Sequence, residues 1–154
     1  MVMTNDEVRE RINRRATPTA QLLNMQVVEV DQDAGTIRMS FDIGEDLSNP
    51  NGTVQGGIIA AMLDDAAAYA AIVFSKRKIF VPTLEMKVSF FSGAKAGRLY
   101  AEGRCVKFGK TIAYMEADLV DEAGKLLARL SATGAPRDLA NPKLVERKDA
   151  KDKA

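Results

Sequence analysis

Two adjacent carboxylates, Asp64 and Asp65, stand in the middle of an almost wholly apolar stretch from Gly56 to Phe74. Burying even a neutral polar group without a hydrogen-bond partner costs on the order of 2 to 7 kcal/mol. Two carboxylates in an apolar helix are therefore expected to have either a functional role or compensating partners. Adjacent side chains on a helix point about 100° apart, so Asp64 and Asp65 face different surroundings and cannot have the same role. We expect one of them to act in a functional site. The alternative is that both form ion pairs with Lys76, Arg77 or another subunit.

Gly56 and Gly57 begin the same stretch. At a helix N-terminus the unpaired backbone N–H groups and the positive end of the dipole meet, and glycine leaves no Cβ in the way of a ligand. Such an end can polarise a carbonyl group. Two glycines alone could simply permit a tight entry into the helix, but a carboxylate about two turns further on favours a substrate lying beside it.

The chain contains no histidine. This excludes Ser-His-Asp and Cys-His catalysis, most zinc sites and any imidazole base. Catalysis must therefore use carboxylates, lysine, hydroxyl groups or the backbone, and no metal or other cofactor is expected. Cys105 has no histidine partner and falls in an expected strand, so we interpret it as a packing residue.

A chain of 154 residues with 46% hydrophobic and 28% charged residues fits one soluble domain, residues 1–154. A net charge of +1 argues against a nucleic-acid partner. The single cysteine excludes an intrachain disulfide, and no signal peptide is recognisable, so we expect a cytoplasmic location. The paired aspartates disfavour a membrane span over 56–74.

Alternating apolar and polar residues predict six strands, at residues 25–30, 36–43, 80–91, 98–107, 111–120 and 126–134. A helix is expected over 56–74, a peripheral helix over 4–15 and a short helical turn over 20–24. The fold class is therefore α+β, with one long buried helix wrapped by a curved antiparallel sheet of about six strands. The core covers about 18–136, and the charged segment 137–154 is expected to be mobile.

In the strand expected over 80–91, strict alternation assigns one face to Leu84, Met86, Val88 and Phe90. It assigns the other face to Thr83, Glu85, Lys87 and Ser89.

Asn49, Gly52, the Gln55-Gly56-Gly57 triplet and Asp64 follow one another at fixed spacing. This spacing resembles the signature of hotdog-fold acyl-CoA thioesterases of the PaaI-like branch. That signature has an Asn, a Gly three residues later, His-Gly-Gly three further on, and an acidic residue seven after the second Gly. The resemblance continues at 83–86, 92–95 and 109–114 and covers roughly residues 18–135.

The resemblance implies a role for each matching residue. Asp64 would attack the thioester carbonyl or activate the water that does so, while the Gly56 N–H would hold the carbonyl oxygen. Asn49 would orient the carbonyl or the water, and Thr83 would place a hydroxyl near the nucleophile. Gln55 stands where many relatives have His, and it can position a group but cannot titrate.

The implied substrate is an acyl-CoA, with a medium-chain or aromatic acyl group. Similar proteins form homodimers or homotetramers in which two subunits share each site, with the Asp of one facing the Gly-Gly end of another. Lys107 and Lys110, together with Lys95 or Arg137, would meet the nucleotide phosphates, although each is also an ordinary solvated charge. Aromatic residues for the acyl group are Tyr69, Phe74, Phe90 and Phe91. The substrate-binding set is Gly57, Asp65, Phe90, Lys107 and Lys110.

Three other functions are open. A non-catalytic module that binds acyl-CoA is favoured by Gln55. A hydroxyacyl dehydratase of the same fold is disfavoured, because those enzymes use a histidine. A purely structural protein, with Asp64 and Asp65 in interface ion pairs, would have no acyl-CoA affinity.

Overall fold

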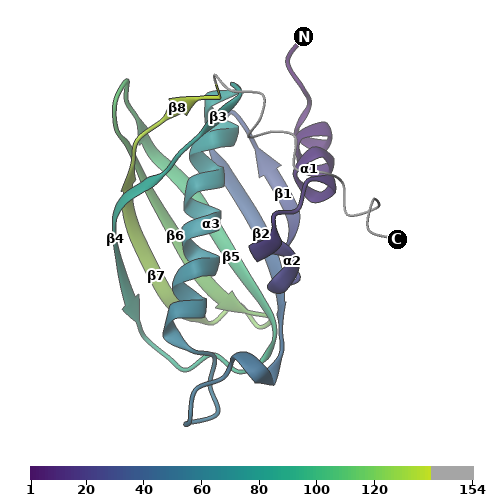
Figure 1. Cartoon of the computed structure of the whole chain (residues 1–154), viewed down its shortest axis with the longest axis vertical. Coiled ribbons are helices and arrows are strands. Elements are labelled where there is room, and N and C mark those ends of the chain that lie inside the picture. The colour runs from purple at the N-terminus through teal and green to yellow at the C-terminus, as the bar shows by residue number, and fades with distance from the viewer. Residues whose placement is uncertain (140–154) are drawn as a thin grey trace.

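The computed structural model describes residues 1–139, which form a curved six-stranded antiparallel sheet with one long helix on its concave side (Figure 1). The sheet order is β1-β2-β5-β6-β7-β4. The elements are α1 (Asn5–Arg14), α2 (Pro18–Leu22), β1 (Gln26–Asp31), β2 (Thr36–Ile43), the 3-10 turn η1 (Glu45–Leu47), α3 (Gly56–Ser75), β3 (Ile79–Phe80), β4 (Thr83–Phe90), β5 (Gly97–Phe108), β6 (Ala113–Asp121), β7 (Leu126–Gly134) and β8 (Arg137–Asp138).

Small residues allow α3 to lie directly against the sheet. Ala66 and Ala67 are completely buried, and they face Gly103 of β5. A Cβ on Gly103 would lie 2.1 Å from the carbonyl oxygen of Ala66, which no real structure tolerates. The alanine-rich composition of the helix is therefore explained by close contact with β5 and its neighbours.

The sheet covers only one side of α3. Ile58, Ala61, Ala68 and Ile72 follow the helical repeat along its outer face and are only half-buried within the chain. By length and composition alone α3 could cross a membrane, but it packs on the sheet as a core helix does. The prediction of one long helix on a curved sheet is confirmed, while burial on all sides is not reached within one chain.

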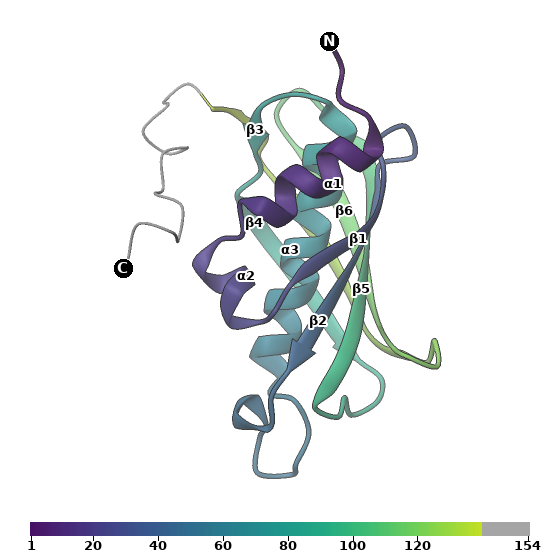
Figure 2. The same cartoon turned by 90° about the vertical axis from the view of Figure 1, so that its right-hand side faces the viewer.

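The helix α1 covers the outer edge of β1 (Figure 2). It begins at a capping box in which Thr4 and Glu7 each bond to the other's backbone N–H. Further along, the side-chain amide of Asn13 accepts from the Val27 N–H at 2.7 Å and donates to the Val27 carbonyl at 3.1 Å. Asn13 thus satisfies both outward backbone groups of Val27, and α1 shields this part of the sheet edge from a second strand.

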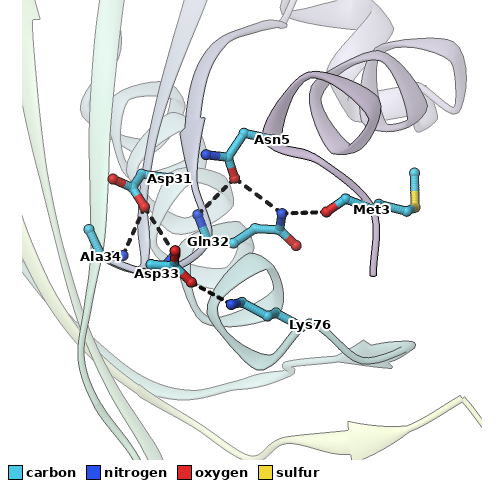
Figure 3. Close-up of polar contacts among 7 residues, drawn as sticks. All are labelled: Met3, Asn5, Asp31, Gln32, Asp33, Ala34 and Lys76. Atoms are coloured by element: carbon cyan, nitrogen blue, oxygen red, sulfur yellow. Dashed lines mark hydrogen bonds and ion pairs between the residues drawn. The ribbon is translucent and has the colours of Figure 1, made fainter. Parts of the chain in front are cut away.

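A second contact holds α1 at the turn between β1 and β2 (Figure 3). The buried Gln32 donates from its side-chain amide to the Met3 carbonyl at 2.9 Å and to Asn5 Oδ1 at 3.1 Å. In the same turn, Asp33 pairs with Lys76 at the end of α3. The N-terminal helix is therefore part of the packed structure.

The structure corrects the prediction at the C-terminal end. Arg137 and Asp138 form β8, which pairs with β3 through Ile79 and Phe80, whereas a mobile segment was predicted to begin at residue 137. The pairing was missed because two-residue strands carry no alternation. The rest of the predicted tail, residues 140–154, lies outside the described residues.

Candidate active site

The start of α3 offers free backbone donors. Gln55 is the N-cap residue, and its carbonyl accepts from the N–H groups of Ile58 and Ile59. Within the described part of the chain, the N–H groups of Gly56 and Gly57 donate to no acceptor, as expected for a first helical turn. The Gln55 side chain is exposed and makes no capping hydrogen bond. This end of α3 can therefore receive a carbonyl oxygen.

The loop before α3 is held by Asn49. Its Oδ1 accepts from the backbone N–H of Asn51 at 3.0 Å and of Thr53 at 3.3 Å, and its Nδ2 donates to the Thr53 hydroxyl at 3.0 Å. The Asn49 amide thus fixes the turn, in which Gly52 has a φ of +77°. Asn49 therefore holds the loop at the rim of the site. Its hydrogen-bond partner Thr53 was not among the predicted site residues.

A hollow of about 390 Å³ lies beside this helix end. Its walls include Asn49, Gly56, Phe90 and Phe91. The ring of Phe90 lies so close to Gly56 that a Cβ there would be 3.3 Å from Phe90 Cζ. Three of the predicted site residues, Asn49, Gly56 and Phe90, are therefore brought together in one cavity. Ser92 and Gly93 also line it and were quoted only as part of the resemblance.

Asp64 and Thr83 meet at a different place. The Thr83 hydroxyl donates to Asp64 Oδ1 at 2.6 Å, so this carboxylate is oriented by β4. Strict alternation predicted Thr83 on the face opposite Met86, and this is wrong. A β-bulge between Thr83 and Glu85 pairs Thr83 with Gly134 and Glu85 with Thr133. The extra residue, Leu84, turns Thr83 toward the helix.

Asp65 has a different environment from Asp64. Burial, and to a smaller extent the charge of the neighbouring Asp64 carboxylate, raises the pKa of Asp65 to about 6. Burial, and then the charge of Asp65, also raise the pKa of Tyr69, which lies one turn further along α3. The alternative in which these aspartates pair with Lys76 or Arg77 is not observed, because those two side chains pair with Asp33 and Asp138. Asp65 is thus a desolvated carboxylate on another flank of the helix.

The sequence profile of the thioesterase superfamily matches residues 51–128, half of the chain. The matched segment contains both helix-start glycines, both carboxylates and Thr83. The chain belongs to the thioesterase superfamily.

Other members of this superfamily cover most of the chain. Human acyl-coenzyme A thioesterase 13 is 29% identical over 97 residues, which span 62% of this chain and 69% of that protein. A phenylacetic acid degradation-related protein from Ralstonia eutropha is 30% identical, with a TM-score of 0.74 over 82% of this chain and 97% of the other. The E. coli PaaI protein shares the fold at 17% identity, with a TM-score of 0.75 over 84% and 91%. The chain is accordingly a hotdog-fold thioester hydrolase.

The remaining predicted site residues of this thioesterase-superfamily chain lie elsewhere. Lys107 and Lys110 are exposed on β5 and the following turn, with β6 and β7 between them and β4. Phe74 packs against Phe108, with ring centroids 6.0 Å apart, near the other end of α3. Of the four aromatic residues predicted for the acyl group, only Phe90 and Phe91 line the hollow. Cys105 packs against the core, as predicted, and burial raises its pKa.

Proposed function

We propose that the protein hydrolyses acyl-CoA thioesters to the free acid and CoA, with Asp64 as the catalytic carboxylate. The observation that carries this is the 2.6 Å hydrogen bond from Thr83 to Asp64 on an otherwise apolar helix. A fixed carboxylate can attack the carbonyl carbon or take a proton from water. Because a thiolate is a good leaving group, oriented attack and oxyanion stabilisation suffice without a histidine.

The oxyanion donor in this proposal is the Gly56 N–H, with Gly57 following it at the open end of α3. Eight residues separate Gly56 from Asp64, which corresponds to about 12 Å along a helix at 1.5 Å per residue. One thioester group cannot contact both within one chain, because an attacking atom must come within about 3.5 Å of the carbonyl carbon. We therefore propose that two subunits share each site, as the hotdog resemblance implies.

The open edge of β4 supports such a dimer. At the other sheet edge, Asn13 occupies the outward backbone groups of Val27 in β1, whereas among residues 1–139 β4 has a hydrogen-bonded neighbour only in β7. Three large apolar side chains of this edge strand, Leu84, Met86 and Phe90, are 58%, 44% and 54% exposed. Exposed apolar side chains along an unpaired strand are typical of a surface that a second chain covers. Two β4 strands paired antiparallel about a two-fold axis would bring the Thr83 end of one against the Phe90 end of the other. Asp64 would then face the partner's Gly56.

The acyl group would occupy the 390 Å³ hollow beside Gly56, where Phe90 and Phe91 favour a medium-chain or aromatic group. Asn49 would position the carbonyl or the attacking water through the Nδ2 hydrogen that does not bond to Thr53. Gln55, exposed at the N-cap, would orient the substrate without transferring a proton. Lys107 and Lys110 are the proposed cations for the nucleotide phosphates.

A non-catalytic acyl-CoA-binding module is the second candidate, and the observation that favours it is Gln55 in place of His. Thiol release from short, medium, long and aromatic acyl-CoAs separates the two functions. We expect the wild type to hydrolyse some of them, Asp64→Asn to lose turnover while still binding, and Asp65→Asn to retain turnover. Binding without hydrolysis by the wild type would instead support the module.

A further inference from the structure

We propose that Thr53 closes the end of the hollow that lies away from Gly56, and that its methyl group sets the longest acyl chain the site accepts. This inference rests on the acyl-CoA hydrolysis proposed above. It adds the residue that limits the length of the acyl group, and it gives that residue no step in the chemistry.

Two segments of the chain form opposite sides of the hollow. Residues 53–56 lead into α3 and residues 90–94 leave β4, and members of both line the cavity. The segments run in opposite directions, because Gly56 lies against the Phe90 ring whereas Thr53 lies against Gly93. The hollow therefore has one end at Gly56 and the other at Thr53. Three extended residues span at most about 10 Å, which bounds the length of an acyl group whose carbonyl lies at Gly56.

A tight contact closes the Thr53 end. A Cβ on Gly93 would lie 2.9 Å from Thr53 Cγ2, closer than real carbon atoms approach, but 3.7 Å from Thr53 Cβ, which is an ordinary contact. One methyl group, Cγ2 of Thr53, thus fills the space between the two segments. Beside it, the Val54 N–H donates to the Ala94 carbonyl at 2.8 Å and joins the segments. Loss of the methyl group would therefore lengthen the hollow by about one carbon atom.

Hydrogen bonds hold both sides of this contact in place. The Asn49 side chain accepts from the Thr53 N–H at 3.3 Å and donates to the Thr53 hydroxyl at 3.0 Å, and the Asn49 N–H donates to the Thr53 carbonyl at 2.7 Å. On the other segment, the N–H groups of Phe91 and Ser92 both donate to the Leu127 carbonyl of β7, at 2.8 and 3.1 Å. An acyl chain one methylene too long would have to displace this hydrogen-bonded backbone, which weakens its binding.

The floor of the hollow is apolar. Val54, Ile59 and Ala94 line it and are 2%, 3% and 1% exposed. Each methylene that covers this floor leaves water, so affinity should rise by about fourfold per methylene until the chain reaches Thr53. The expected dependence on chain length is a steady rise followed by a sharp fall.

The test measures kcat/KM for a series of straight-chain acyl-CoAs in the wild type, Thr53→Ser, Gly93→Ala and Thr53→Ser/Gly93→Ala. In the wild type, kcat/KM should fall by on the order of tenfold between the longest accepted chain and the next homologue. Thr53→Ser keeps the hydroxyl that Asn49 binds and loses only Cγ2, so its limit should lie one methylene longer. In the double variant the added Cβ at position 93 refills the gap, and the wild-type limit should return.

Unfolding temperature gives a second readout of the same contact. Gly93→Ala alone sets a Cβ 2.9 Å from Thr53 Cγ2 and should lower the unfolding temperature, whereas the double variant should not show this loss. Thr36→Ser is the matched control, because it removes the same methyl group at the exposed start of β2 and should leave the length limit unchanged. Should Gly93→Ala fail to fold, the length limits of Thr53→Ser and the double variant still decide.

Binding is measured separately by calorimetry with ketone analogues, in which a methylene separates the CoA sulfur from the carbonyl and no thioester is present. The limit in Kd should move by one methylene in Thr53→Ser, as it does in hydrolysis. The same limit in Thr53→Ser and the wild type, or a longer limit kept by the double variant, would overturn the role of Thr53. Hydrolysis with a limit indifferent to position 53 overturns only that role, and length-limited binding without hydrolysis overturns only the proposed activity. A wild type that neither binds nor hydrolyses any chain overturns both.

Discussion

At the scale of single residues, Asp64 and Asp65 are adjacent in sequence but differ in environment. Asp64 is oriented by a hydroxyl from β4, whereas Asp65 is desolvated and accepts no hydrogen bond from any side chain in residues 1–139. Side chains one residue apart on a helix diverge by about 100°, which explains why the two carboxylates have different surroundings. Of the two, we propose only Asp64 as the catalytic carboxylate. Each has its own measurable consequence.

The hydrogen bond to Asp64 predicts the effect of removing the Thr83 hydroxyl. Thr83→Val keeps the shape of the side chain but leaves the carboxylate without its donor. A hydrogen bond to a charged group is worth about 1.5 to 3 kcal/mol, so kcat should fall by roughly 10- to 100-fold. Thr83→Ser should retain most of the activity. Steady-state hydrolysis of the best acyl-CoA measures both, and an unchanged kcat in Thr83→Val would remove the hydroxyl from the mechanism.

The raised pKa of Asp65 predicts a pH-dependent stability. Its carboxyl binds a proton more tightly in the folded chain, with a pKa of about 6 against 3.8 when unfolded. The folded state is therefore favoured below about pH 4 and loses stability as the pH rises to about 6. Asp65→Asn carries no charge, so at pH 7 it should unfold with a free energy larger than wild type by on the order of 2 kcal/mol.

Urea unfolding at pH 4 and pH 7 measures this difference, which should vanish at pH 4. The exposed Glu10→Gln variant is the control for general charge effects and should show no such dependence. An Asp65→Asn advantage of equal size at both pH values would contradict the assigned cause.

At the scale of elements, the contact between α3 and β5 is set by Gly103. Gly103→Ala would place a Cβ 2.1 Å from a helix carbonyl, so the helix or strand must shift. We expect the free energy of unfolding to fall by about 2 to 4 kcal/mol. Gly57→Ala is the matched control, because a Cβ there meets nothing within 4 Å. Thermal and urea unfolding compare them, and equal stability of the two variants would show that the packing tolerates the methyl group.

The elements themselves could largely be predicted from the sequence. Alternation in β2 and β7 and the long apolar run of α3 are local patterns, and their observed bounds agree with the expected ones to within a residue. The bulge at Leu84 was not predictable, because it depends on pairing with β7 rather than on composition. The β3–β8 pair was missed for the same reason, since it joins distant residues, Ile79 with Asp138 and Phe80 with Arg137.

The site could be predicted as a list of residues but not as an arrangement. The family resemblance proposed Gly56, Asp64 and Thr83 as site residues, and the structure places the last two in contact. The loop-holding role of Asn49 depends on the fold of residues 49–53. Lys107 and Lys110 lie far from β4 because β6 and β7 stand between β5 and β4 in the sheet. This strand order could not be predicted from the sequence.

At the scale of the whole molecule, the proposed site needs residues from two chains. Within residues 1–139, Asn13 and α1 shield one edge of the sheet at Val27, while the other edge, β4, pairs with no further strand and exposes Leu84, Met86 and Phe90. The carboxylate and the helix end are separated along α3 by about 12 Å. A two-fold dimer through β4 resolves these features together, because it covers the edge and joins the two half-sites twice.

Complementation between defective subunits tests this account most directly. Asp64→Asn and Asn49→Ala damage opposite halves of the proposed site, and each should be nearly inactive alone. When equal amounts are unfolded and refolded together, half of the dimers contain one of each chain. Each such dimer has one intact site, so about one quarter of the wild-type activity should return. A mixture that forms heterodimers but recovers no acyl-CoA hydrolysis would contradict the shared site.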